Sequence, residues 1–386
     1  MLDQKILERL EQYPTPFYFY DLRLLEKTLS KAKSAAQKNQ IHIHYALKAN
    51  YNQPILERIV AAGFGADCVS GAEVLKALES GFKPEGIMLA GVGKTDREIE
   101  IAIDHNIACI NVESAEELSI IAKIAKSKKK VATIALRINP HVEAFTHQFI
   151  TTGTIDDKFG IGTDELPELF DYIQKQASLK FCGLHFHIGS QISDASVLDT
   201  LCEKVNEINQ WFLDRNCVLP VINMGGGLAI DYENPDQHPI PDFESYFHRL
   251  HKNLKIRPEQ KILVELGRSI VGQCGSLVTK VTFKKKSGTK EFLILDAGMT
   301  ELIRPALYGA KHKIQKLNAT PHDLQNTIKY EVVGPICESS DSFGSDVLLP
   351  VTSRRNILII RSTGAYGEVM SSNYNLREKA PAVYIE

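Results

Sequence analysis

Cysteine is scarce in this chain and is never clustered. The seven cysteines stand singly at positions 68, 109, 182, 202, 217, 274 and 337, and no C-x-x-C pair occurs. This spacing excludes a zinc ribbon and disfavours a disulfide scaffold, because both need cysteines in close sets. We therefore predict no metal site, and the isolated thiols favour a reducing compartment such as the cytoplasm.

An excess of charge and a long apolar run are also missing. Lys and Arg number 45 against 47 Asp and Glu, so the formal net charge is −2. This balance gives no electrostatic reason to expect a nucleic acid or an anionic membrane as partner. No apolar run approaches the roughly 20 residues that span a bilayer, and residues 1–9 lack the apolar core of a secretory signal. We expect a soluble intracellular protein.

Residues from about 24 to 270 alternate between amphipathic helical patterns and short apolar runs rich in β-formers. The runs cover residues 41–47, 65–69, 86–90, 107–112, 131–138, 181–187, 221–224 and 261–266. Eight strand–helix units over roughly 250 residues are typical of a (β/α)8 barrel of the TIM type. A doubly wound sheet remains an alternative, because a count of units does not show that the sheet closes.

Several of the intervening helical patterns begin directly after a residue that favours helix N-caps. These residues are Ser70, Thr95, Ser114 and Thr163. They predict where the helices between the apolar runs start.

The character of the sequence changes after about residue 271. Strand-like runs at 275–283, 291–295, 328–333, 345–349 and 356–360 are separated by turn signals, with little helical pattern. We predict a C-terminal all-β domain, and the strand-like segment 17–21 is expected to join its sheet. The predicted domains are a barrel over 24–270 and a β-sandwich or barrel-like domain formed by 1–23 and 271–386.

Polar and glycine residues gather where the predicted barrel strands end, which is where barrels place their reactive groups. They are Lys48 after the first run, Arg137 in the fifth, His187 and Ser190 at the sixth, Gly225, Gly226 and Gly227 after the seventh, and Glu265, Gly267 and Arg268 at the eighth. Glycines after the seventh and eighth strands are suited to bind phosphate through backbone N–H groups. With a lysine and an acid beside them, they indicate pyridoxal 5′-phosphate, whose aldehyde a lysine binds as a Schiff base.

Short motifs then connect the chain with a known family. They are YALKAN at 45–50, HIGSQ at 187–191, GGGL at 225–228, ELGR at 265–268, RPALY at 304–308, CES at 337–339 and GAY at 364–366. In order and spacing the sequence resembles the fold-III pyridoxal-phosphate-dependent decarboxylases, and among them the diaminopimelate decarboxylases. One departure is Leu266, where the family usually has proline.

The resemblance implies a role for each residue that matches a cofactor motif. Lys48 would form the Schiff base, Glu265 would pair with the pyridine nitrogen, His187 would stack on the ring, and Arg137 would approach the ring hydroxyl. The phosphate donors would be Ser190, Gly225, Gly226, Gly227, Gly267, Arg268 and Tyr366.

The resemblance also implies the substrate, meso-diaminopimelate, which carries a second amino-acid group at its far end. Arg268, Arg304 and Tyr308 would bind the distal carboxylate, and Glu338 the distal ammonium. Tyr366 is expected to contact the substrate as well. Cys337 would return a proton to the carbanion. In the family Cys337 and Glu338 come from the second subunit, which implies a homodimer with shared active sites, and residues 141–158 resemble the family's active-site loop.

Other readings of the sequence make different predictions. A related decarboxylase for ornithine or arginine would not need Arg304, and one for carboxynorspermidine fits poorly with the motifs at 45–50 and 337–339. An alanine racemase needs no clamp for a distal group. A non-enzymatic decoy would be expected to lack Lys48, Cys337 or the phosphate glycines, all of which are present.

Overall fold

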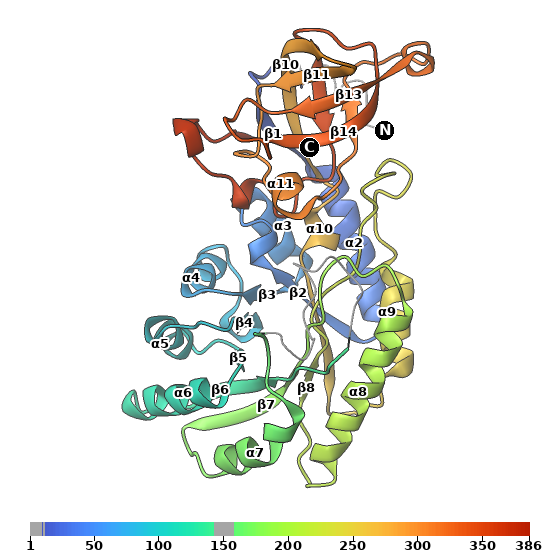
Figure 1. The fold of residues 1–386 in the computed structure, drawn as a ribbon. Helices are drawn as coiled ribbons and strands as arrows, with labels where there is room; N and C mark the ends of the chain where they lie inside the picture. Colours follow the sequence, from blue (N-terminus) through green and yellow to red (C-terminus); the bar gives the residue numbers. More distant parts are fainter. Residues whose placement is uncertain (1–9, 11, 143–157) are drawn as a thin grey trace. The chain divides into compact units, whose positions relative to one another are not determined.

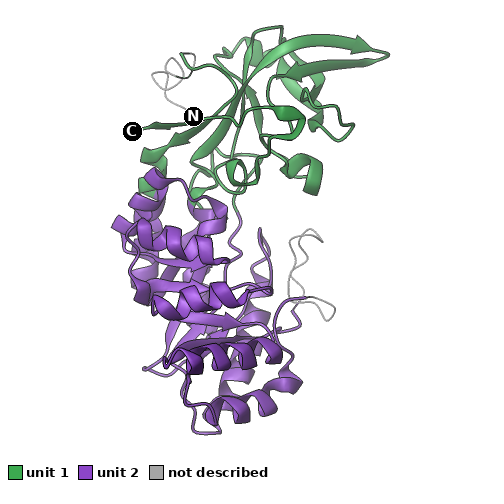
Figure 2. Ribbon diagram, turned by 90° about the vertical axis from the view of Figure 1, so that its left-hand side faces the viewer, with its two compact units in different colours: residues 1–27, 230–241, 271–386 green, residues 28–229, 242–270 purple. Residues whose placement is uncertain are grey.

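The structure is a computed structural model of the 386-residue chain, and it describes residues 10, 12–142 and 158–386. The chain forms two compact units (Figure 2). Unit 1 comprises residues 1–27, 230–241 and 271–386, and unit 2 comprises residues 28–229 and 242–270. The barrel was predicted over 24–270, whereas the structure groups residues 24–27 and 230–241 with unit 1.

Unit 2 is a closed barrel of eight parallel strands (Figure 1). The strands are β2 (Ile41–Ala46), β3 (Gly65–Cys68), β4 (Ile87–Leu89), β5 (Cys109–Val112), β6 (Ala132–Arg137), β7 (Leu179–His185), β8 (Val221–Asn223) and β9 (Lys261–Leu266). β2 pairs with β9, which closes the barrel. The predicted (β/α)8 barrel is therefore confirmed, and the doubly wound alternative is wrong.

Helices cover the outside of these strands (Figure 1). They are α2 (Leu22–Lys38), α3 (Gln53–Ala62), α4 (Gly71–Glu79), α5 (Asp96–Asp104), α6 (Ala115–Ser127), α7 (Leu166–Gln174), α8 (Ser196–Leu213) and α9 (Phe243–Asn253). A single turn of helix, α10 (Arg268–Val271), follows β9 directly.

Three of the four predicted caps begin helices as expected. The side chains of Ser70, Thr95 and Ser114 accept hydrogen bonds from backbone N–H groups at the starts of α4, α5 and α6. Thr163 instead lies inside a 3-10 turn, η3 (Thr163–Glu165), that precedes α7. The prediction for Thr163 is wrong because the chain enters α7 through this tighter turn.

Strand β7 contains an irregularity that affects the barrel interior. Its pairing with β6 changes register between Ile134 and Ala135, as a β-bulge does. Cys182 packs in the interior with Leu263, and His185 bonds to Glu265 two residues further along β9. Residues three apart would face opposite sides of a regular strand. The bulge therefore lets Cys182 and His185 share the interior face.

Unit 1 is built on a sheet of eight strands. The strands are β1 (Phe17–Asp21), β10 (Gly275–Ser287), β11 (Lys290–Leu295), β12 (Ile314–Lys316), β13 (Thr327–Val333), β14 (Ser342–Pro350), β15 (Ile357–Ile360) and β16 (Ala382–Ile385), with a short helix α11 (Arg304–Tyr308). β1 pairs antiparallel with β10 and parallel with β16. The expectation that the N-terminal strand joins the C-terminal sheet is confirmed.

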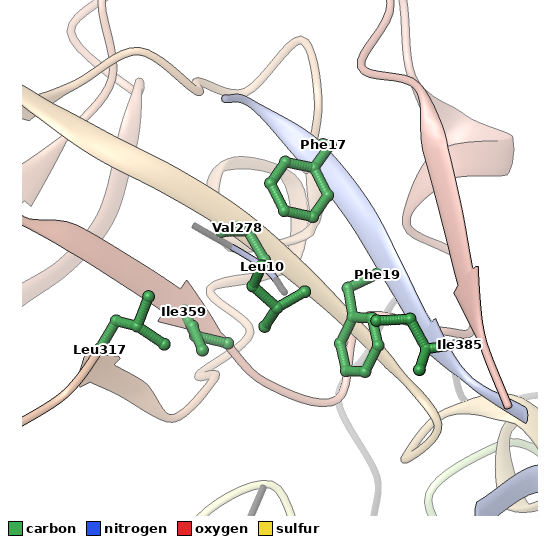
Figure 3. Close-up of a cluster of buried hydrophobic side chains, with 7 residues drawn as sticks. All are labelled: Leu10, Phe17, Phe19, Val278, Leu317, Ile359 and Ile385. Carbon is green, nitrogen blue, oxygen red and sulfur yellow. The ribbon is translucent and has the colours of Figure 1, made fainter. Parts of the chain in front are cut away.

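Apolar side chains from both ends of the chain meet on this sheet (Figure 3). The cluster consists of Leu10, Phe17, Phe19, Val278, Leu317, Ile359 and Ile385. Burying such side chains removes apolar area from water, at about 25 cal/mol per Å². The two chain ends are thus held in one core of unit 1.

In the described part of the chain, none of the helices has the length and apolar character that crossing a membrane requires.

Candidate active site

The residues predicted for the cofactor lie at the carboxyl ends of the barrel strands. Lys48 is in a 3-10 turn, η1 (Leu47–Ala49), directly after β2. Arg137 is the last residue of β6, and Glu265 lies near the end of β9. His187 and Ser190 follow β7, the glycine triplet follows β8, and Gly267 and Arg268 follow β9. Because all eight strands are parallel, these side chains and turns belong to one end of the barrel.

Lys48 lies beside a buried acid from β3, Asp67, that was not among the predicted site residues. Its Nζ is 3.8 Å from Oδ2 of Asp67, whose side chain is 1 % exposed. Burial and the charge of Glu265 raise the pKa of Asp67, and the opposing effect of Lys48 does not cancel them. The pKa of Asp67 therefore lies above its usual range. Its Oδ1 is buried and has no hydrogen-bond partner among the described residues.

Glu265 is the charged member of this pair of acids. Burial alone would raise its pKa, but His185, His187 and Lys48 together lower it below the usual value. Oε2 of Glu265 is 3.0 Å from Nε2 of His185, and Nδ2 of Asn223 donates to Oε1 at 2.7 Å. A carboxylate that accepts two such bonds keeps its charge and still has lone pairs for a further donor.

The ring of His187 is neutral. The backbone N–H of Gly226 donates to its Nδ1 at 3.1 Å, so the ring proton resides on Nε2. Removal from water and the charges of Lys48 and Arg137 lower the pKa of His187 well below its ordinary value. A neutral, oriented imidazole is suited to pack against a flat ring.

The glycine triplet is needed for the turn after β8. Gly225 has φ +67° and Gly227 has φ +129°, which favour glycine. A side chain at Gly226 would collide with the carbonyl oxygen of Glu265. Two of the three N–H groups are already used, because Gly225 donates to Asn223 Oδ1 at 2.9 Å and Gly226 donates to His187.

Arg137 is fixed by a buried acid. Its Nη1 is 2.6 Å from Oε1 of Glu113, and both side chains are less than 10 % exposed. The other carboxylate oxygen of Glu113 accepts from the N–H of Gly160 at 3.0 Å. The guanidinium carbon of Arg137 lies 4.6 Å from the centre of the Phe159 ring. Glu113 thus orients Arg137 at the end of β6.

Ser190, which follows β7, and Arg268, which follows β9, are hydrogen-bonded to each other. The Arg268 guanidinium donates to Oγ of Ser190 from Nε at 3.2 Å and from Nη2 at 3.1 Å. A serine hydroxyl and a buried arginine are both donors that a phosphate can accept from.

The residues predicted for the substrate lie in unit 1. Arg304 begins α11 and is 6 % exposed. Its guanidinium carbon is 5.7 Å from the ring centres of both Tyr308 and Tyr232. The sequence analysis did not single out Tyr232, and its only signal is the aromatic residue itself in the segment 230–241. Two aromatic rings beside a buried guanidinium hold it in place for a carboxylate.

Cys337 and Glu338 lie in the loop between β13 and β14 of unit 1, and both are exposed. The hydroxyl of Tyr374 donates to Oε1 of Glu338 at 2.6 Å. The backbone N–H of Cys337 donates to Oδ1 of Asn375 at 3.4 Å. Tyr366 follows β15 in a left-handed conformation, with φ 57°. Of the predicted active-site loop, residues 143–157 lie outside the described residues.

Sequence reasoning missed several residues that complete the barrel site: Asp67, Glu113, His185 and Asn223. Asp67 and Asn223 stand in apolar runs, where a polar residue is itself a signal. His185 stands two residues before His187, and its role becomes visible only with the bulge in β7.

The residues of this barrel end fit a phosphorylated aldehyde such as pyridoxal phosphate. A lysine lies beside a buried acid, one oxygen of which has no hydrogen-bond partner within the described part of the chain. A second acid is ionised, and the glycine turn leaves no room for side chains. The lysine suits the aldehyde, the ionised acid suits a protonated ring nitrogen, and Ser190 and Arg268 suit the phosphate.

Similarity to known proteins also indicates a pyridoxal-dependent enzyme. The model of the family "Pyridoxal-dependent decarboxylase, pyridoxal binding domain" matches residues 22–272. The diaminopimelate decarboxylase of Bacteroides thetaiotaomicron is 46 % identical over 373 residues, which cover 96 % of each chain.

Solved structures are similar over nearly the whole chain. The diaminopimelate decarboxylase of Helicobacter pylori in complex with L-lysine has a TM-score of 0.90 at 38 % identity, covering 98 % of this chain and 93 % of that one. That of M. jannaschii with L-lysine has a TM-score of 0.89 at 30 % identity, covering 98 % and 89 %. With a lysine, two acids and a glycine turn at the matching barrel end, the chain belongs to the diaminopimelate decarboxylase family of the pyridoxal-dependent decarboxylases.

Proposed function

We propose that this protein decarboxylates meso-2,6-diaminopimelate to L-lysine and CO2, the last step of lysine biosynthesis. The observation that carries the proposal is the arrangement of Lys48 beside the buried Asp67 in a barrel end where His185 and Asn223 also hold Glu265 in its charged form. Family membership over the full chain supports the substrate, and two relatives have been solved with L-lysine.

Pyridoxal 5′-phosphate, when bound, supplies the ring system that accepts the electron pair released with CO2. Lys48 would hold it covalently until the substrate amine replaces the lysine. Glu265 would keep a proton on the ring nitrogen, and His185 and Asn223 hold Glu265 in its charged form. The neutral ring of His187 would pack against the cofactor ring, and Arg137 would face its hydroxyl.

We assign the phosphate mainly to hydrogen-bond donors in the turns that follow β7, β8 and β9. Ser190, Gly267 and Arg268 would donate to it, and Tyr366 would add a hydroxyl from unit 1. The bonds already made by Gly225 and Gly226 favour Gly227 as the donor of the triplet.

The distal end of the substrate would be read by unit 1. Arg304 can bind a carboxylate bidentately, and Tyr308 and Arg268 would be further donors. By resemblance to the family, Tyr366 would also contact the substrate. Glu338 would bind the distal ammonium. This pairing distinguishes diaminopimelate from ornithine and lysine, whose distal ends carry only an amine.

Cys337 would deliver the proton that replaces CO2 at Cα. By resemblance to the family, Cys337 and Glu338 act in the site of a second copy, so we propose a homodimer with shared active sites. We also propose a cytoplasmic location, because all seven cysteines are free thiols.

The direct test is release of CO2 from the purified, cofactor-loaded protein incubated separately with meso-diaminopimelate, lysine and ornithine. We expect release from diaminopimelate alone. Reduction with borohydride should attach the cofactor to the peptide that contains Lys48. CO2 from ornithine or lysine in preference to diaminopimelate would contradict the substrate, and labelling of a different lysine would contradict the site.

A further inference from the structure

A cavity lies at the end of the barrel opposite to Lys48. Its volume is about 960 Å³, and it is lined by residues at or near the starts of all eight strands. The lining includes His42 and Lys261, both from strand starts, and Lys180, which precedes Cys182. All of these residues belong to unit 2. The proposed decarboxylation uses none of them.

Two thiols lie in contact inside this cavity. Sγ of Cys182 is 3.4 Å from Sγ of Cys109, and both residues line the cavity. Cys109 is 0 % exposed and Cys182 is 7 % exposed. They come from β5 and β7, and they pack with Met88, Ala135 and Leu263 in one layer of the interior.

The bulge in β7 makes this contact possible. Because of the bulge, Cys182 and His185 of β7 both face the barrel interior. Cys109 and Cys182 are 73 residues apart in the sequence. The contact is therefore a product of the folded barrel and not of local chain geometry.

The geometry is favourable for joining the two sulfur atoms. A disulfide bond is about 2.05 Å long, so the sulfur atoms must approach by little more than 1 Å from their separation of 3.4 Å. Burial and the neighbouring Cys182 raise the pKa of Cys109, so at rest its thiol is protonated. The slightly exposed Cys182 is therefore the sulfur that a small reagent in the cavity reaches first, beside the exposed Lys180 and Lys261.

We propose that Cys109 and Cys182 form a dithiol site at the amino-terminal end of the barrel that reacts with small peroxides and closes to a disulfide. The Cys182 thiolate attacks one peroxide oxygen, the S–O bond forms, the O–O bond breaks, and hydroxide leaves and takes the thiol proton as water. The Cys109 sulfur then attacks the Cys182 sulfur, the S–S bond forms, the S–O bond breaks, and a second water leaves. Two thiols lose two electrons and the peroxide gains them.

The experiment treats the cofactor-loaded enzyme with hydrogen peroxide, blocks the remaining thiols after denaturation, and maps tryptic peptides by mass spectrometry. Cys109 falls in peptide 98–123, and Cys182 falls in peptide 181–204, which also contains Cys202. Cys202→Ser is thus the matched control, because it removes the second thiol of that peptide without touching the pair.

We expect peptides 98–123 and 181–204 to be joined in the wild type and in Cys202→Ser, and to separate after reduction. The joined species should be absent from Cys109→Ser and Cys182→Ser. The wild-type measurement needs no variant, so it decides even if a buried substitution prevents folding. Recovery of Cys109 and Cys182 as separately blocked thiols, in a sample whose exposed Cys337 has been oxidised, would overturn the proposal.

Discussion

At the scale of single residues, the barrel end is governed by which of its two acids carries the proton. Asp67 and Glu265 are both buried, and each charge disfavours the other. His185 and Asn223 donate to Glu265, whereas Oδ1 of Asp67 has no partner among the described residues. The charge therefore settles on Glu265, where a ring nitrogen would need it.

Replacing His185 by alanine should raise the pKa of Glu265, because a donor to its charged form is lost. A charge-assisted hydrogen bond contributes about 1.5–3 kcal/mol, so we expect kcat/KM at acid pH to fall by roughly 10- to 100-fold. In a plot of kcat/KM against pH, the fall in activity on the acid side should begin at a higher pH. His185→Gln keeps an N–H donor and should restore part of the rate. An acid limb that stays in place in His185→Ala would show that His185 does not position Glu265.

The same substitution should change the dependence of stability on pH. A lowered folded pKa of Glu265 stabilises the fold above the unfolded value of about 4.3, and that contribution is lost as the pH falls through the folded pKa. In His185→Ala the folded pKa is higher, so the loss on acidification should begin at a higher pH. Thermal unfolding of both proteins between neutral and acid pH measures the difference.

Replacing Cys337 by alanine should separate proton delivery from cofactor binding. Cys337 is exposed in unit 1, and its thiol is assigned to neither the aldehyde nor the phosphate. We expect the visible absorbance of the bound cofactor to remain and the rate of CO2 release to fall by about 10²–10⁴-fold, the usual contribution of a positioned general acid. Cys217→Ala, which changes a partly exposed thiol on the barrel, is the control. Near-normal turnover in Cys337→Ala would remove Cys337 from the mechanism.

At the scale of elements, capping side chains fix where the barrel helices begin. The backbone N–H of Thr95 donates to Oε2 of Glu98 at 2.9 Å, and the Thr95 hydroxyl accepts from the Glu98 N–H. The other Glu98 oxygen accepts from the N–H of Gly71 at 2.9 Å, which connects the starts of α4 and α5.

Thr95→Ala should therefore lower the free energy of unfolding by about 1 kcal/mol, as the loss of an N-cap usually does. Denaturant titration measures the change, and kcat should stay the same because α5 carries no proposed site residue. Ser127→Ala, at the exposed end of α6, removes a bond to Ile124 and should change stability by less than about 0.5 kcal/mol. Equal effects of the two substitutions would show that the capping box does not stabilise α5.

The elements also show what the sequence can predict. Apolar runs located all eight barrel strands to within two residues at each end, because continuous burial of a parallel strand leaves a clear pattern. The bulge in β7 leaves no such pattern in the sequence, because a bulge depends on how the strand pairs with its neighbour. For that reason Lys48 and Glu265 were found at strand ends, and His185 was not. The short strands β12 and β16 were missed for a similar reason, as their pairing partners define them.

At the scale of the whole molecule, the predicted functional residues are divided between two units. Lys48 and Glu265 belong to unit 2, and Arg304, Cys337 and Glu338 belong to unit 1. The proposed homodimer assigns Lys48 and Cys337 of each active site to different chains. This assignment can be tested with two variants that are each inactive alone.

Homodimers of Lys48→Ala and of Cys337→Ala should both release almost no CO2. In a mixed dimer one site collects both defects, and the other receives an intact lysine from one chain and an intact cysteine from the other. Random exchange at equal concentrations makes about half of the dimers mixed, so about one quarter of all sites should regain activity under two-fold symmetry. If both residues came from one chain, every site would retain one defect and nothing would recover. CO2 release after mild dissociation and mixing therefore distinguishes the two arrangements, provided that subunit exchange is verified with differently tagged chains. The absence of any gain after verified exchange would show that each chain supplies its own lysine and cysteine.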